Sequence, residues 1–190
     1  MTGNGRGHLI AVDGVSGVAV AAEARRVLKA SGRARGGISW WDASGLFDQL
    51  TVAGEEAGAA SPRTLLLLYA ADLAFRLRWE IEPTLDEGKT VVAAPYVDTA
   101  VAFGRAAGLR GRWLSNLFQF APRPATRRDV AAGPRSGVAR SGFVEFAATR
   151  LSGRVLGLSR RQLIARTRAH LTVTADRSKR RKASERSGWL

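Results

Sequence analysis

The chain has 190 residues, no cysteine and a formal net charge of +14. This length suits one domain with a sizeable core, and the hydrophobic fraction of 45% excludes a chain that is disordered throughout. Without cysteine there is no disulfide or thiolate, and two histidines are too few for a histidine cluster, so we expect no metal site. Since no stretch is apolar for long enough to cross a membrane, we expect a soluble cytoplasmic protein.

The positive charge is concentrated in the last third of the chain. Residues 1–120 carry 13 basic and 12 acidic side chains, whereas residues 121–190 carry 17 basic and 4 acidic ones. Such a field attracts phosphates, nucleic acid or an acidic protein. We therefore expect a nucleic-acid or acidic protein partner to bind through residues 121–190. Arginine-rich codon usage is the alternative explanation.

The first predicted elements are a strand, a glycine turn and a helix. Residues 8–13 are mostly apolar and predict a buried strand, and residues 19–29 predict an amphipathic helix. This is the frame of a phosphate-binding loop, in which backbone N–H groups at the helix N-terminus hold phosphates. The turn between the two elements contains the candidate loop residues Asp13, Gly14, Ser16 and Gly17.

The loop lacks the residues that phosphoryl transfer needs. A phosphate loop has glycine, four residues, a second glycine, a lysine that neutralises phosphate and a hydroxyl that holds magnesium. Started at Gly14, this template places Ala19, Val20 and Ala21 at its last three positions. Two interpretations remain open: Val20 and Ala21 pack the helix on the sheet, or they line a pocket that still binds phosphate. Asp13 would repel a phosphate unless it points away or holds a metal.

Further strands and helices alternate along the middle of the chain. Residues 38–41 predict a short strand, and Ser61 and Pro62 are typical of the start of a helix. We expect that helix over residues 62–82, ended or kinked by Pro83. Residues 89–94 predict a strand buried on both faces. This alternation indicates an α/β fold with a parallel sheet.

Two more helices are predicted after residue 99, one starting with "AVAF" and one over residues 111–121. We expect a single domain over residues 1–172. The polar, charged segment 173–190 predicts a basic flexible tail.

The order of these segments resembles the thymidylate kinase family over about residues 8–130. The family's leucine-rich "LLF-AADR" helix corresponds to "LLLYAADL", its "P-L-x-x-G-x-x-V" passage to "PTLDEGKTVV", and its "DRYVDSSLAYQ" to "APYVDTAVAFG". The resemblance implies a P-loop kinase-like fold, a three-layer parallel sheet with helices on both faces. It also implies a homodimer. We expect the interface on helix 62–82, which offers Leu66, Tyr69, Leu73 and Trp79.

The departures from the family fall on its charged catalytic positions. Val20 stands for the loop lysine, Ala21 for the magnesium-binding hydroxyl, and Pro95 for the arginine of "DRY". Further departures are Ala94 for the acidic residue of "DRY", Leu73 and Trp40 for arginines, and Gly104 for a glutamine near the substrate base. Tyr96, Asp98 and Thr99 persist and, with Trp40, form a candidate ligand pocket.

The basic last third offers two further motifs. In the family an arginine-rich lid follows the similar region, so residues 123–142 are a lid-like candidate or a solvated basic loop. The candidate phosphate or nucleic-acid contacts there are Arg127, Arg128, Arg135 and Arg140. Residues 156–163 resemble the turn and second helix of helix-turn-helix regulators, with Arg160 and Arg161 at the helix start. The alternative is an amphipathic helix, capped by Ser159, that packs on the body.

Together these patterns predict a catalytically degenerate thymidylate kinase-like protein, a pseudo-kinase that binds or scaffolds and retains at most nucleotide or phosphate binding. We expect no catalytic residue and no cofactor, with magnesium and ATP needed only if activity persists. The alternatives are a thymidine monophosphate kinase or other phosphotransferase with an unusual site, and a nucleic-acid-binding protein that uses the basic last third.

Overall fold

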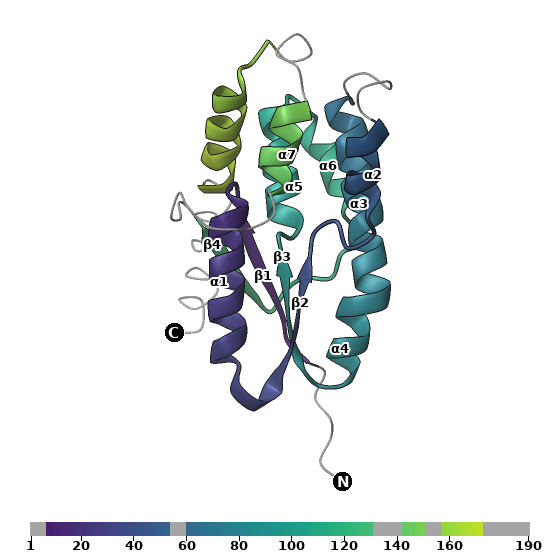
Figure 1. The fold of residues 1–190 in the computed structure, drawn as a ribbon, viewed down its shortest axis with the longest axis vertical. Coiled ribbons are helices and arrows are strands. Elements are labelled where there is room, and N and C mark those ends of the chain that lie inside the picture. Colours follow the sequence, from purple (N-terminus) through teal and green to yellow (C-terminus); the bar gives the residue numbers. More distant parts are fainter. Residues whose placement is uncertain (1–6, 54–59, 131–141, 151–156, 173–190) are drawn as a thin grey trace, which may run out of the picture.

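The computed structural model describes residues 7–53, 60–130, 142–150 and 157–172 (Figure 1). Its centre is a four-stranded parallel sheet in the order β2-β3-β1-β4. The strands are β1 (Leu9–Gly14), β2 (Arg35–Trp40), β3 (Thr90–Ala94) and β4 (Thr126–Val130). The predicted parallel α/β fold is therefore confirmed. None of the helices in the described part of the chain is long and apolar enough to cross a membrane.

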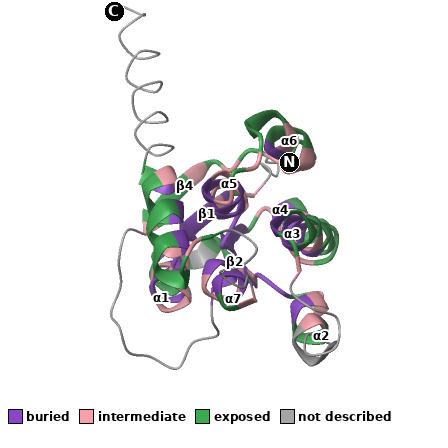
Figure 2. Cartoon of the chain, turned by 90° about the horizontal axis from the view of Figure 1, so that it is seen from above, coloured by how far each residue is buried: buried purple, intermediate pink, exposed green. Residues whose placement is uncertain are grey.

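Helices cover both faces of this sheet, as Figure 2 shows from above. On one face lies α1 (Gly17–Ala30), which packs Val20, Ala24 and Val27 against Val12 and Val92. On the other face lie α3 (Pro62–Arg76), α4 (Glu82–Asp86) and α5 (Val97–Ala106). Each face of the sheet has its own hydrophobic core. Successive residues of a strand contribute to one core and then the other, because their side chains point to opposite faces of the sheet. The three-layer expectation is confirmed.

The long helix continues beyond Pro83, so the proline does not end it, the first of the two predicted alternatives. It starts as expected, with the Ser61 hydroxyl accepting a bond from the Thr64 N–H at 3.1 Å. After α3 a π-helical turn spans Leu77–Ile81, and α4 follows directly. Pro83 lies in the first turn of α4, where a residue without an N–H breaks no helical bond.

Three of the four residues expected to form a dimer interface on this helix are not available at the surface. Leu66, Tyr69 and Leu73 are fully buried in the chain's own core against the sheet and its neighbouring helices. Only Trp79 is exposed, at 65%. The exposed apolar side chains of this helix are Leu67, Phe75 and Trp79.

The first part of the lid-like segment is a strand. Residues 126–130 form β4, which pairs with β1 in the register Ala11 to Arg127 and Val12 to Arg128. Residues 126–130 are therefore held at the edge of the sheet by their pairing with β1. Arg135 and Arg140 lie outside the described residues, as do residues 173–190.

Three shorter helices complete the body. They are α2 (Leu46–Ala53), α6 (Gly111–Leu117) and α7 (Phe143–Arg150), of which α6 ends earlier than the predicted helix. The sequence analysis expected no helix at α2. In Figure 1, α7 lies beside α5, above the ends of the strands.

A last helix spans residues 160–172 and packs on the body. Ser159 and Gln162 exchange the two hydrogen bonds of a capping box, from the Ser159 N–H at 2.7 Å and the Gln162 N–H at 3.2 Å. Leu163 and Leu171 are buried in the main core, and Arg160 and Arg161 are exposed. This burial supports the alternative of an amphipathic helix that packs on the body. Residues 151–156, which would join α7 to this helix in a helix-turn-helix, lie outside the described residues.

Candidate functional site

A cavity of about 300 Å³ opens at the carboxyl ends of β1, β2 and β3. Ligands of open parallel sheets bind at this edge. Its walls come from the loop after β1 and the start of α1, from the ends of β2 and β3, and from the residue before α7. The lining residues are Gly14, Gly17, Val20, Ala21, Arg25, Trp40, Trp41, Ala94, Pro95 and Gly142.

Five of the sequence-predicted site residues meet in this cavity, namely Gly14, Gly17, Val20, Ala21 and Trp40. Val20 and Ala21 are 3% and 6% exposed. Val20 packs α1 on the sheet and also lines the cavity. The packing interpretation therefore holds at this residue, and phosphate binding stays a prediction. The wall that would carry a lysine and a hydroxyl is therefore apolar.

The N-terminus of α1 is occupied by a carboxylate from α7. Glu145 Oε2 accepts the Gly17 N–H at 3.0 Å and the Gly142 N–H at 2.9 Å. Ser16, the residue at the N-cap, makes no side-chain capping bond among the described residues. Positive partial charge at a helix N-terminus favours an anion, and here the chain supplies its own. The approach is close, because a Cβ on Gly142 would lie 2.8 Å from the Gly17 nitrogen.

Asp13 points away from the cavity and holds the start of α5. Its Oδ1 accepts the Thr99 hydroxyl at 2.7 Å and the backbone N–H groups of Thr99 and Tyr96 at 2.9 and 3.0 Å. The Thr99 hydroxyl in turn accepts the Gly14 N–H at 3.0 Å. Burial, and next the negative charge of Asp98, raise the pKa of Asp13 to about 7 against the lowering effect of these hydrogen bonds.

The candidate pocket of Trp40, Tyr96, Asp98 and Thr99 is divided by the structure. Trp40 lines the cavity, and Thr99 supports the loop from behind. Tyr96 and Asp98 line a separate groove of about 560 Å³ between α5, α6 and β4. There the Tyr96 hydroxyl donates to the Pro122 carbonyl at 2.8 Å, and Asp98 pairs with Arg127. The expectation that all four residues share one pocket is wrong, because α5 turns Asp98 toward β4.

An aromatic cluster fills the space between α7 and its neighbours. The Phe143 ring lies 4.6 Å from that of Tyr69 and 5.2 Å from that of Phe103, between centroids. Trp41 lies edge-on to Phe47 at 5.2 Å and to Phe143 at 6.0 Å. These contacts fix Trp41, one wall of the cavity, and hold α7 in place.

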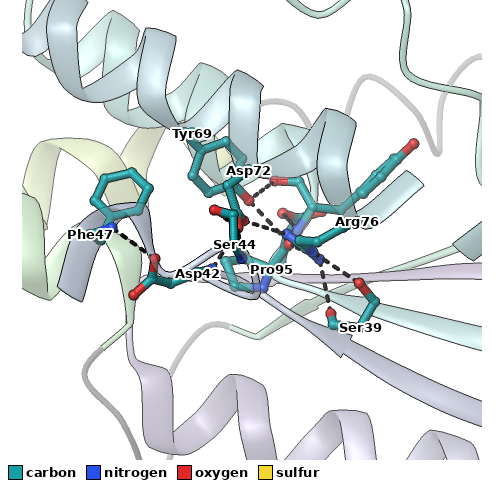
Figure 3. Close-up of polar contacts among 10 residues, drawn as sticks. Ser39, Asp42, Ser44, Phe47, Tyr69, Asp72, Arg76 and Pro95 are labelled. Atoms are coloured by element: carbon teal, nitrogen blue, oxygen red, sulfur yellow. Dashed lines mark hydrogen bonds and ion pairs between the residues drawn. The ribbon is translucent and has the colours of Figure 1, made fainter. Parts of the chain in front are cut away.

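A buried polar cluster lies behind the end of β2 (Figure 3). The Arg76 guanidinium donates to the Ser39 hydroxyl and carbonyl, both at 2.9 Å, and to the Pro95 carbonyl at 3.1 Å. Asp72, 3.8 Å from Arg76, accepts the N–H groups of Asp42 and Ser44 at 2.9 and 3.0 Å. The cluster ties α3 to the ends of two strands that border the cavity.

Two other departures from the family pattern have packing reasons. Leu73 is fully buried in the main core. Gly104 allows α5 to pack closely, because a Cβ there would lie 2.4 Å from Leu114 and 2.9 Å from Leu66. A glutamine at this position would require the Leu114 and Leu66 side chains to shift.

Glu145 and Arg76 are site residues that the sequence analysis missed. Gly142 followed three residues later by Glu145 is one half of a capping box, a signal that would have placed the carboxylate at a helix start. Asp72 and Arg76 are one turn apart on an otherwise apolar helix, which is typical of a buried pair. Nothing in the sequence indicates that Glu145 also reaches Gly17, 128 residues away.

No family model matches the sequence. Local similarity connects it to curated thymidylate kinases. It is 37% identical over 67 residues to a "Probable thymidylate kinase" of Pyrobaculum calidifontis, which is 35% of each chain. It is 41% identical over 58 residues to one of Pyrococcus abyssi, or 30% of this chain and 28% of the relative. The similarity thus spans about a third of the length of these relatives.

The fold is similar over nearly the whole chain to solved thymidylate kinases. The structure from Ehrlichia chaffeensis has a TM-score of 0.64 at 13% identity and covers 92% of this chain and 89% of its own. The structure from Candida albicans has a TM-score of 0.59 at 16% identity, with 88% and 77% covered. The chain therefore has the fold of these solved thymidylate kinases.

Proposed function

We propose that this thymidylate kinase-like chain is a non-catalytic binding protein that keeps the cavity of its fold as a ligand site. One observation carries the proposal: Val20 and Ala21 line the cavity, and Glu145 sits on the N-terminus of α1. The residues present do not fit magnesium and ATP. An apolar wall and a carboxylate stand where a lysine, a hydroxyl and free N–H groups would be needed.

The magnitude of the loss argues against phosphoryl transfer. This reaction depends on positioning and on neutralising charge, and removing a single stabilising donor costs about a hundred- to a thousand-fold in rate. The rate losses from several missing residues need not multiply, because residues that act together are not independent. Each missing residue nevertheless removes charge stabilisation from the same transition state. Arg25, the cation that lines the cavity, is exposed and stacks over Trp40 at 5.7 Å.

The alternative of a phosphotransferase with an unusual site would use Tyr96 and Asp98. Both are engaged elsewhere, with Pro122 and Arg127, in the groove beside β4. The geometry therefore favours the non-catalytic proposal over this alternative.

A second candidate function is binding of nucleic acid or an acidic partner through the basic last third. The observation that favours it is the outer face of the helix over residues 160–172, where Arg160, Arg161, Arg166 and Arg168 are exposed. Exposed cations on one helix attract phosphates without base-specific contacts. This candidate is compatible with a ligand in the cavity.

We also propose a homodimer through the exposed side of the long helix, because Leu67, Phe75 and Trp79 leave apolar surface there. Sedimentation of the purified protein tests this: a dimer that Trp79→Glu dissociates supports the proposal, and a monomer at all concentrations contradicts it.

A thermal-shift panel tests the binding function. The panel contains thymidine, adenosine, their monophosphates, ATP with magnesium, and a short DNA duplex, since a ligand that binds only the folded state raises the melting temperature. A shift with a small molecule supports the cavity as a binding site. A shift with DNA alone moves the function to the arginines of the last third.

A further inference from the structure

The cavity presents flat apolar walls and few free donors. Trp40 and Trp41 meet there with Pro95, Val20 and Ala21. Trp41 is 8% exposed and held by edge contacts with Phe47, Phe143 and Phe146. Walls of this kind suit a planar ring, which buries apolar area and stacks against tryptophan.

Three backbone N–H groups that border the cavity already have acceptors within the chain. The Gly14 N–H is donated to the Thr99 hydroxyl at 3.0 Å. The N–H groups of Gly17 and Gly142 converge on Glu145 Oε2 at 3.0 and 2.9 Å. All three glycines line the cavity, so its glycine donors are satisfied within the chain.

Glu145 is held in this position by the helix that carries it. Its neighbours Phe143 and Val144, and Ala147 and Ala148 one turn later, are buried in the main core. The backbone of Glu145 is therefore held in place, and two hydrogen bonds keep its carboxylate at the N-terminus of α1. An anionic ligand group that approached the N-terminus of α1 would meet a fixed like charge in a partly desolvated place.

Arg25 does not offset this carboxylate inside the cavity. Its guanidinium is exposed and lies over the Trp40 ring, so water and salt screen its charge. Asp13, buried behind the loop at 1% exposed, adds no positive charge either. Among the described residues, Glu145 is therefore the charged group that contacts the N-terminus of α1.

We infer that the cavity accepts an uncharged ligand with a planar ring and rejects its phosphorylated counterpart, and that Glu145 is the residue that sets this selectivity. The inference rests on the proposed function, because it assumes that the cavity binds a small molecule. It names the ligand class and the residue responsible.

Calorimetric titration with matched probes tests the inference. The probes are adenosine and thymidine, each beside its monophosphate, so that each pair differs only in the phosphate. The wild-type protein should bind at least one nucleoside about tenfold or more tightly than its monophosphate. Glu145→Gln keeps an oxygen acceptor for the two N–H groups but removes the charge, and should reduce this preference by about tenfold.

Two further variants locate the effect. Glu87→Gln removes the same charge from the exposed turn before β3, at the opposite end of the sheet, and should leave the preference unchanged. Trp40→Leu removes a ring wall, and should weaken nucleoside binding about tenfold. Nucleoside binding that Trp40→Leu leaves unchanged would place the ring elsewhere and overturn the inference.

The outcomes separate the inference from the function beneath it. A monophosphate that binds wild-type protein as tightly as its nucleoside, with binding of both weakened in Trp40→Leu, overturns the selectivity and leaves the cavity as a binding site. A preference for nucleoside that Glu145→Gln does not change overturns the role of Glu145. Absence of binding by all four probes overturns both the inference and the proposed function.

Discussion

The buried carboxylates of this chain each hold the start of a helix or a loop. Asp13 accepts three donors at the beginning of α5. Asp42 accepts the Phe47 and Asp48 N–H groups at the beginning of α2. Asp72 accepts three donors from the loop between β2 and α2, counting the Ser44 hydroxyl at 2.8 Å. These buried carboxylates near the cavity therefore stabilise the fold, because they accept backbone N–H groups of helices and loops.

The pKa of Asp13 predicts a specific pH dependence. Since the pKa rises from 3.8 to about 7 on folding, the folded state binds a proton more tightly than the unfolded state. Stability from this group is therefore full below pH 4 and is lost as the pH rises toward 7. At about 1.4 kcal/mol per pKa unit the loss approaches about 4 kcal/mol. Asp13→Asn keeps the accepting oxygen and does not titrate.

Chemical unfolding of the wild-type protein and Asp13→Asn between pH 4 and 8 checks this. The wild-type free energy of unfolding should fall relative to that of the variant across the interval. A constant difference between the two proteins would show that Asp13 does not titrate there.

Arg76 should be one of the most sensitive positions in the fold. It is fully buried, and Arg76→Met would strip donors from the Ser39 and Pro95 carbonyls and leave Asp72 without its cation. Removing one partner of a buried charged pair costs about 3–5 kcal/mol. Arg78→Met, an exposed change on the same helix, should cost less than about 0.5 kcal/mol. Urea unfolding measures both, and equal midpoints would contradict the account.

The residues of the cavity could be predicted from sequence only in part. The glycine turn after an apolar strand located Gly14, Gly17, Val20 and Ala21, because strand, turn and helix are adjacent in the chain. Glu145 could not be placed on Gly17, since that contact depends on how α7 packs. The assignment of Tyr96 and Asp98 to the same pocket as Trp40 was wrong because the direction of α5 is a tertiary feature.

At the element scale, α7 determines the shape of the site. Its Phe143 contacts rings from α3 and α5 and Trp41 at the end of β2, and its Glu145 meets α1. This short helix therefore supports the Trp41 wall of the cavity through Phe143 and supplies the carboxylate at the N-terminus of α1 through Glu145. No family motif in the sequence marks this helix, because the resemblance ends near residue 130.

Removing the Phe143 ring should loosen this assembly. Phe143 is 1% exposed, and truncation of a buried phenylalanine to alanine costs about 3–5 kcal/mol. Phe120→Ala, at a position 44% exposed, serves as the control and should cost less than about 1 kcal/mol. Thermal and urea unfolding of both variants check the difference. A Phe143→Ala protein as stable as the control would mean that α7 contributes little to the fold.

Sequence patterns predict where most helices and strands lie. They do not predict where a helix ends or which strands pair. The strands at residues 8–13 and 89–94 are predictable because they are apolar throughout and bounded by turns. β4 escapes prediction because its residues Arg127, Arg128 and Asp129 are polar, and an edge strand needs little apolar surface. Pro83 does not end its helix as predicted, because the π-helical turn before it allows the helix to continue.

At the scale of the whole molecule, the chain joins a nearly neutral body to a cationic last third. The structure places part of that charge on the exposed arginines of the helix over residues 160–172 and part on Arg127 and Arg128 of β4. The arginines of the helix face away from the core that buries Leu163 and Leu171. A polyanion could therefore bind there without disturbing the fold.

Binding of a short DNA duplex should be weak and steeply salt-dependent. Replacing Arg160, Arg161 and Arg168 by glutamine should lower the slope of log affinity against log salt by about one for each phosphate that the variant no longer neutralises. Arg78→Gln, in the neutral body, is the matched control. Fluorescence anisotropy over a salt series measures the slopes, and a slope unchanged in the triple variant would exclude this surface.

We propose that this chain has the fold of the solved thymidylate kinases without their phosphoryl-transfer chemistry. The most direct test is turnover of thymidine monophosphate with magnesium and ATP by the purified protein at high concentration, followed as formation of the diphosphate. The account predicts no product above the uncatalysed background, because the cavity wall is apolar and Glu145 occupies the N-terminus of α1. Diphosphate formation that needs magnesium and scales with protein concentration would contradict it.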